Sequence, residues 1–204
     1  MGMRMWDTLA NNVEALLRVG LLREVEDLPL FVEGIDRDIM SDITTRIIFA
    51  PLAAFTADVV ASYPHFKAHG HQTKTYLRQV WDPSQADWAR ESLHLPVVDG
   101  KPLLLVPKEW VSTHLLMSAG RYYETSVLTY AQLEQAVYSR SGKLLTTPKR
   151  LLKKQPGLGR GRMTNLSVTR RAVGNDDDLL ASFKSFVDLR WLQRRREFAS
   201  AVVA

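Results

Sequence analysis

A short hairpin signal constrains the fold of this chain more than any other feature. Two runs of strand-forming residues, Leu95–Val98 and Lys101–Val106, flank the dipeptide Asp99-Gly100. A two-residue turn between paired strands needs positive φ at both central residues, and Asp-Gly is among the pairs that adopt it most readily. Pro102 cannot donate a backbone hydrogen bond, which favours an exposed edge on its strand. The sequence therefore predicts a β-hairpin that turns at Asp99-Gly100.

Apolar periodicity makes the rest of the chain mainly helical. Leu, Val, Ile and Phe recur every three or four residues, which places them on one face of a helix. Helices are expected over Asp7–Val19, from Ile43 to Val59, over Tyr122–Tyr138 and after Asp176. The short apolar run Leu28–Ile35 is expected to be a strand. The predicted fold class is α+β, mainly helical with a small antiparallel β-hairpin or sheet.

Two of these helices carry boundary signals. Ser41 or Asp42 is expected to cap the helix that follows by accepting hydrogen bonds from its first turn. Pro51 lies inside the same apolar pattern, so it either kinks that helix or begins a second one. Asp176 is the expected cap of the last helix, whose apolar stripe runs from Leu179 to Trp191.

The charges of the chain are divided along its length. Residues 1–139 carry 12 Lys and Arg against 17 Asp and Glu, whereas residues 140–196 carry 15 against 4. Between 139 and 175 the apolar periodicity is lost and Ser, Gly, Pro and basic residues dominate, as in a loop. These shifts predict three parts: an α+β core over 1–139, a basic flexible segment over 140–175 and an amphipathic C-terminal helix over 176–204.

The basic segment is the strongest functional signal in the sequence. Residues 140–171 contain ten Lys and Arg and no acidic residue. Such a surface attracts polyanions, of which nucleic acid is the commonest, and a Gly-rich chain can follow a phosphate backbone without reading bases. The expected nucleic-acid-binding residues are Lys149, Arg150, Lys153, Lys154, Arg160, Arg162, Arg170 and Arg171. Two other interpretations stay open: a patch that docks an acidic protein partner, and a solubilising loop.

An acidic cluster precedes the second helix. Glu33, Asp36, Asp38 and Asp42 are four carboxylates within ten residues. Mg²⁺ is bound through one or two carboxylates together with phosphate oxygens and water, as in metal-dependent nucleases. One hypothesis is therefore a nuclease-like site with Asp38 and Asp42 as catalytic residues and Glu33, Asp38 and Asp42 as metal ligands. The alternative is that these acids only cap a helix and line a solvated turn.

Other classes of site are weakly supported or excluded. The absence of cysteine excludes disulfides, thiolate metal sites and thiol nucleophiles. No apolar run approaches the ~20 residues of a membrane helix, and no signal peptide is evident, so we expect a cytoplasmic protein without membrane contact. His65, His69 and His71 could bind zinc through one helix face, but Pro64 and Gly70 favour a turn and a surface cluster.

Three blocks of the sequence resemble a family of uncharacterised bacterial proteins. The first block runs from Glu33 to Ile48 and contains Glu33-Gly34-Ile35, Asp38 and Ser41-Asp42-Ile43-Thr44-Thr45. The second is Leu95–Lys108, and the third is Tyr122-Tyr123. Arg46 departs from the family pattern, which usually has Asn there. Family members also carry a further N-terminal region that this chain lacks, so we expect a short member.

The resemblance implies a bacterial origin and an association with mobile elements or defence loci, but no reaction. Combined with the charge pattern, it leads to two functional expectations. The first is a nucleic-acid-associated protein, with a nuclease-like site at Asp38 and Asp42 that would use Mg²⁺. The second is a non-catalytic subunit whose basic region docks on an acidic protein partner.

Overall fold

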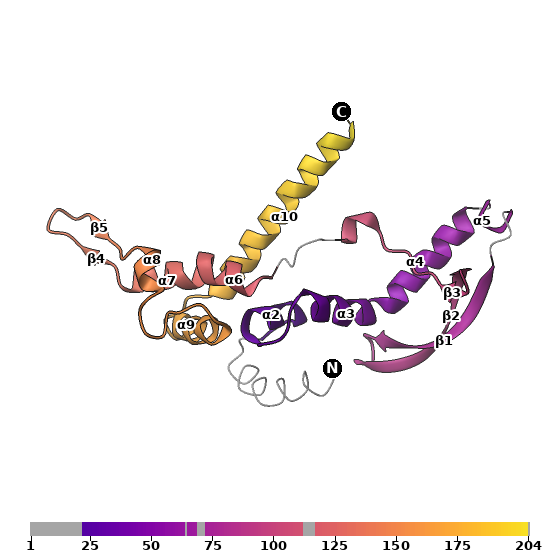
Figure 1. Cartoon of the computed structure of the whole chain (residues 1–204), viewed down its shortest axis with the longest axis horizontal. Coiled ribbons are helices and arrows are strands. Elements are labelled where there is room, and N and C mark those ends of the chain that lie inside the picture. Colours follow the sequence, from indigo (N-terminus) through magenta and orange to yellow (C-terminus); the bar gives the residue numbers. More distant parts are fainter. Residues whose placement is uncertain (1–21, 64, 69–71, 112–116, 204) are drawn as a thin grey trace. The chain divides into compact units, whose positions relative to one another are not determined.

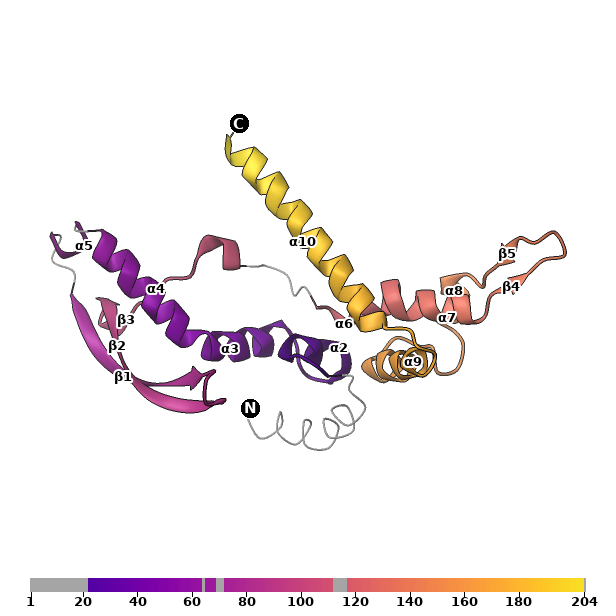
Figure 2. The same cartoon turned by 180° about the vertical axis from the view of Figure 1, so that it is seen from behind.

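The computed structural model describes residues 22–63, 65–68, 72–111 and 117–203 (Figures 1 and 2). The chain forms two compact units: unit 1 joins Met1–Asp36 to Leu115–Ala204, and unit 2 is Arg37–His114. Helices dominate the described residues, and the sheets are small and antiparallel. This confirms the predicted fold class. The helix expected over Asp7–Val19 lies outside the described residues.

Unit 2 consists of helices packed on a three-stranded sheet of order β1-β2-β3. Its elements are α3 (Arg37–Ile47), α4 (Phe49–Ser62), α5 (His65–Ala68), β1 (Thr73–Asp82), β2 (Asp87–Val98), β3 (Lys101–Pro102) and the 3-10 turn η2 (Lys108–Trp110).

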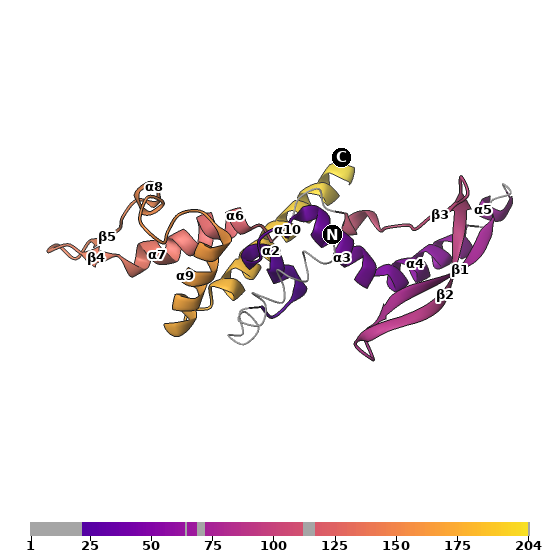
Figure 3. The same ribbon diagram turned by 60° about the horizontal axis from the view of Figure 1, so that its bottom comes forward.

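The core of unit 2 forms where α4 lies along one face of the β1–β2 hairpin (Figure 3). Ala53 of α4 is buried against Val80, Leu93 and Leu95 of the sheet. Thr56 is also buried there, and its hydroxyl donates to Leu52 O while accepting from Leu105 N. The buried hydroxyl thus both donates and accepts, and it ties the segment after β3 to α4.

The expected turn at Asp99-Gly100 is confirmed, but the hairpin differs in length. Asp99 and Gly100 have φ of 50° and 76°, as a two-residue hairpin turn requires. The strand after it is only Lys101–Pro102, paired with Val97 and Val98. The long hairpin, β1 with β2, was not predicted. Its four-residue turn at 83–86 lacks an Asn-Gly or Asp-Gly signal, and few of its side chains are buried.

The helix boundaries in unit 2 also need correction. The expected caps, Ser41 and Asp42, lie inside α3, which already begins at Arg37. Pro51 does start a new helix: it lies in the first turn of α4, where a missing N–H costs no hydrogen bond.

Among the described residues, no single helix is long and apolar enough to cross a membrane. The pair α3 and α4, bent by 66°, meets that test only when the two are joined.

Unit 1 is a helical assembly with one short protruding hairpin (Figure 1). Its elements are η1 (Val25–Asp27), α2 (Leu28–Phe31), α6 (Ala119–Tyr122), the π-helical segment η3 (Tyr123–Val127), α7 (Leu128–Glu134), β4 (Val137–Tyr138), β5 (Leu144–Leu145), α8 (Lys149–Leu152), α9 (Arg162–Gly174) and α10 (Leu179–Val203).

Aromatic rings organise the core of unit 1. The ring of Tyr122 is fully buried and meets Phe31 and Phe183 edge to face, at centroid distances of 5.8 and 5.0 Å. The Tyr122 hydroxyl lies 2.7 Å from Thr169 Oγ1, so its polar end is also satisfied. Burial raises the pKa of Tyr122 above its ordinary value. The core therefore draws on α2, α6, α9 and α10, which are distant in sequence.

Two predictions for unit 1 are wrong. Leu28–Ile35 is not a strand: Leu28–Phe31 forms α2, which follows the capping box of Glu24 and Asp27 at η1 and has Pro29 in its first turn. Residues 139–175 are not all loop, because residues 162–174 form α9. Its buried face includes Asn165 and Thr169, so apolar periodicity missed it. The three-part division of the chain at residues 139 and 175 stays a prediction.

The start of the last helix lies two residues later than expected. Asp178, not Asp176, caps α10, since Asp178 Oδ1 accepts a hydrogen bond from Ala181 N at 2.9 Å. Asp176 instead has a φ of 61° in the preceding turn. The apolar stripe of α10 is confirmed, with Phe183 and Val187 buried.

Candidate nucleic-acid interface

The ten basic residues of 140–171 fall into two groups in unit 1. One group makes hydrogen bonds or ion pairs within the unit, and the other extends into solvent. Sequence alone could not separate them, because the partners of the first group come from distant segments. The engaged group is Lys149, Lys153, Arg162 and Arg171.

Arg162 is the most deeply engaged of the four. Its guanidinium donates to Pro29 O, Ile35 O and the Glu33 carboxylate, each at 3.0 Å. The two carbonyls belong to α2 and the turn after it, so the fork of Arg162 holds this segment against the start of α9. Arg162 is therefore a structural residue, although the sequence placed it among the nucleic-acid-binding residues.

The other engaged cations hold the region around η3 and α7. Lys149 Nζ donates to Glu124 O and to Thr129 Oγ1, at 2.7 and 2.8 Å. Lys153 forms an ion pair with the Glu124 carboxylate at 2.6 Å, and Arg171 forms one with Glu134 at 3.0 Å. These three charges are partly neutralised or sequestered before any ligand arrives.

The second group has six members, all exposed. Within the described part of the chain, none of them has a carboxylate at ion-pair distance. Arg140 and Lys143 flank Gly142 at the tip of the β4–β5 hairpin, where Gly142 has a φ of 78°. The six are Arg140, Lys143, Arg150, Lys154, Arg160 and Arg170.

The Arg160 guanidinium lies against the backbone at Gly120. A Cβ added at Gly120 would overlap the Arg160 guanidinium. Beside this pair, the buried Tyr123 hydroxyl donates to Leu158 O at 2.7 Å and closes the turn that precedes Arg160. Arg160 is thus an exposed cation whose guanidinium end lies beside the helix that begins at Ala119.

Apolar side chains accompany the cations on the hairpin. Val137 pairs with Leu145, and Tyr138 with Leu144. All four are exposed, Tyr138 to 76%. The apolar residues lie at the base of the hairpin and the basic ones at its tip, so one ligand could touch both.

The predicted metal ligands lie on both units. Glu33, in unit 1, pairs with Arg162. Asp38 and Asp42, in unit 2, are exposed one turn apart on α3, and Asp38 also lies 3.6 Å from the Arg37 guanidinium. The nuclease-like site at these residues stays a prediction.

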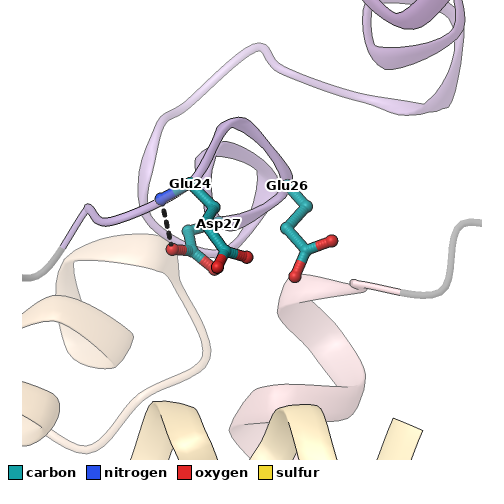
Figure 4. A group of neighbouring side chains, drawn as sticks. All are labelled: Glu24, Glu26 and Asp27. Atoms are coloured by element: carbon teal, nitrogen blue, oxygen red, sulfur yellow. Dashed lines mark hydrogen bonds between the residues drawn. The ribbon is translucent and has the colours of Figure 1, made fainter. Parts of the chain in front are cut away.

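Unit 1 contains a different acidic cluster, which the sequence pattern did not predict. The carboxylate oxygens of Glu24, Glu26 and Asp27 lie within 4.8 Å of one another (Figure 4). Lys184 Nζ contacts all three, at 2.6, 3.2 and 2.9 Å. The 2.9 Å pair with Asp27 Oδ1 is an ion pair without good hydrogen-bond direction. The lysine thus stands where a metal ion would have to bind.

The pKa values in this cluster follow from the lysine. Burial by itself would lower the pKa of Lys184, but the hydrogen bond to Glu24 and the close negative charges of Asp27 and Glu26 outweigh it and raise that pKa. The hydrogen bond from Lys184 lowers the pKa of Glu24, whereas burial raises the pKa of Glu26. The cluster is an ion-pair network that joins η1 to α10.

Unit 1 also has an open groove of about 510 Å³ beside η3. Its wall is rich in hydroxyl groups, and Asn175 Nδ2 donates to Tyr130 Oη at 2.7 Å within it. The lining residues are Thr125, Ser126, Thr129, Tyr130, Leu133, Glu134, Asn175, Asp177, Leu179 and Ser182.

Of the three histidines singled out by the sequence, His65 lies in α5, whereas His69 and His71 lie outside the described residues.

Comparison with known proteins gives one result. A family model described as "Domain of unknown function (DUF8370)" matches residues 1–118. The match includes all of unit 2 and ends before the basic segment. No curated protein and no solved structure matches the chain. Since the match covers more than half of the 204 residues, the chain belongs to the DUF8370 family, a domain of unknown function.

Proposed function

We propose that this protein binds nucleic acid without sequence preference through the exposed cations of residues 140–171. One observation carries the proposal: six of the ten basic residues in this segment are both exposed and without a described carboxylate at ion-pair distance. Ion-paired lysines and arginines contribute little to a surface potential, whereas unpaired ones attract phosphates. The segment itself contains no acid to oppose that attraction.

The strength of binding should depend steeply on salt. Each phosphate contact releases condensed counterions, so log affinity for duplex DNA falls with log salt at a slope of about −0.9 per contact. If about five of the exposed cations engage, the slope is roughly −4 to −5. Engagement of the two cations at the hairpin tip, of Arg150 and Lys154 beside α8 and of Arg160 would together give this value.

The test replaces four exposed cations, Arg140, Lys143, Arg150 and Lys154, with Ala. We expect the salt slope on duplex DNA to shrink by about 3 to 4, with equal loss on unrelated sequences. The matched control replaces four exposed cations of unit 2, Arg46, Lys74, Lys101 and Lys108, and should leave the slope within about 1 of wild type. No binding of the wild-type chain to DNA or RNA at ~50 mM salt would overturn the proposal.

A second candidate function is docking of an acidic protein partner. It is favoured by the exposed apolar side chains at the base of the hairpin, which a phosphate backbone does not need. Replacing Tyr138 and Leu144 with Ser separates the two functions. Nucleic-acid binding should persist in this variant, whereas binding to an acidic amphipathic peptide should be lost.

A narrower form of the first function adds Mg²⁺-dependent cleavage at Asp38 and Asp42, within a mobile-element or defence system. Two exposed carboxylates one helical turn apart are compatible with a cation bound jointly by protein and phosphate oxygens.

A further inference from the structure

The sheet of unit 2 has one open face. Side chains alternate along a strand, so the residues opposite those that pack on α4 point the other way. The Thr75 Oγ1 to His94 Nε2 contact of 3.0 Å and the edge-to-face contact of Trp81 with Trp88 identify that second set. It comprises Thr75, Leu77, Gln79 and Trp81 of β1, and Trp88, Arg90, Ser92 and His94 of β2.

This face is exposed and free of acidic residues. Within the described residues of unit 2, no helix covers it (Figure 3). Leu77 is 60% exposed and Trp88 is 41% exposed. Asp82, Asp87 and Glu91 fall on the α4 side by alternation, so Arg90 supplies the only formal charge among the eight residues.

We propose that this face binds single-stranded nucleic acid by stacking bases on its tryptophans. Sequence-tolerant single-strand binding combines aromatic platforms with a cation for the backbone, because every base has a stacking face. The contact with Trp81, at 5.5 Å between ring centroids, restricts the Trp88 ring and prepares it for stacking. A duplex keeps its bases stacked and paired, so the site selects unpaired strands.

The length of the face sets the size of the ligand. From Trp88 to His94 the strand advances six residues, or about 20 Å at ~3.3 Å per residue. Arg90 lies between them, next to Trp88 on the same face. A strand of several nucleotides can therefore stack on the tryptophans while its phosphates pass Arg90. A ten-nucleotide oligothymidine covers the whole site.

This inference goes beyond the cationic surface and does not depend on it. The two sites lie on different units and use different chemistry, which makes their failures distinguishable. The quadruple variant, in which Arg140, Lys143, Arg150 and Lys154 are Ala, should lose binding to duplex DNA but still bind oligothymidine by stacking. A tryptophan variant should keep binding to duplex DNA but lose the stacking contribution to oligothymidine binding.

The experiment measures fluorescence anisotropy of labelled oligothymidine with the full-length chain in which Arg140, Lys143, Arg150 and Lys154 are Ala, so that the cationic surface does not also bind the probe. Trp88→Ala and Trp81→Ala should each weaken binding about 5- to 150-fold, whereas Trp88→Phe should keep most of it. Trp110→Ala is the matched control, because Trp110 is an exposed tryptophan of the same unit outside the sheet. Circular dichroism of each variant shows whether the fold is retained.

A second readout does not depend on folding of variants. Oligothymidine in which one base is 5-iodouracil, irradiated with the wild-type chain, should cross-link to the peptide that contains Trp81 or Trp88. Cross-links confined to other residues would overturn the proposal. So would wild-type affinity in a folded Trp88→Ala chain, or binding of a neutral oligosaccharide on this face with none of oligothymidine.

Discussion

At the scale of single residues, the lysines and arginines of this chain have two different roles: some hold the fold together, and others are exposed to solvent. Arg162 satisfies two backbone carbonyls and one carboxylate, and Lys184 contacts three acids. Arg150 and Lys154, in contrast, extend into solvent. Charge alone does not distinguish these residues. Their interaction partners distinguish them. A substitution of an engaged residue should therefore affect stability, and a substitution of an exposed one should affect nucleic-acid binding.

Arg162→Ala should therefore reduce stability. Removing the guanidinium leaves the carbonyls of Pro29 and Ile35 without their donors, and hydrogen bonds to charged groups contribute about 1.5–3 kcal/mol. We expect the free energy of unfolding to fall by about 2–3 kcal/mol, measured by urea denaturation. Arg162→Lys should restore only part of this, because an ammonium cannot reproduce the fork. If Arg162→Ala kept wild-type stability but lost nucleic-acid binding, the structural role would be wrong.

At the scale of elements, substitutions in α3 can test the nuclease hypothesis without unfolding the protein. The helix begins at Arg37, so Asp42 does not cap it and Asp38 lies in its first turn. Replacing exposed acids here is expected to cost little stability, within about 1 kcal/mol for the effect of Asp38 on the helix dipole. A change in activity would therefore report chemistry and not unfolding.

The double variant Asp38→Asn with Asp42→Asn separates cleavage from binding. We expect Mg²⁺-dependent cleavage of DNA or RNA by the wild-type chain, and its loss in the variant with binding retained or slightly strengthened. The control, Asp176→Asn, changes an exposed acid of unit 1 and should leave cleavage unchanged. A wild-type chain that binds but never cleaves with Mg²⁺ would contradict the catalytic role of both residues.

At the scale of the whole molecule, the chain divides into two compact units with separate cores. Leu93 belongs to the core of unit 2, and Phe183 to the aromatic core of unit 1. The N-terminal segment joins the rest of unit 1 through the Arg23–Asp178 ion pair at 2.8 Å and through the contacts of Glu24, Glu26 and Asp27 with Lys184. Unit 1 is thus assembled from both ends of the chain.

Separate cores should give separate responses to cavity-forming substitutions. Leu93→Ala should destabilise unit 2 by about 2–5 kcal/mol, and Phe183→Ala should destabilise unit 1 by about 3–5 kcal/mol. Hydrogen exchange resolves the two: protection should fall in β1 and β2 for the first variant and in α9 for the second. Equal loss of protection in both units from either change would show one cooperative core.

Local signals determined part of this fold from the sequence alone. The Asp99-Gly100 turn depends on two residues' own φ preferences, so it could be identified without any partner. The apolar stripe of α10 also follows from spacing along one helix. The excess of basic residues over 140–171 is a property of composition. None of these needs a contact between distant segments.

Only the tertiary structure decided the rest. A short apolar run such as Leu28–Phe31 fits a strand as well as a helix. In the fold it is helical, and it is held by distant partners: Phe31 meets the ring of Tyr122, and Arg162 donates to Pro29 O. Helix α9 buries Asn165, which donates to Leu30 O, a partner 135 positions away. Likewise, Arg162 differs from Arg150 only through carbonyls that folding brings to it. The energy of a buried polar or charged group depends on long-range partners, and no local pattern specifies them.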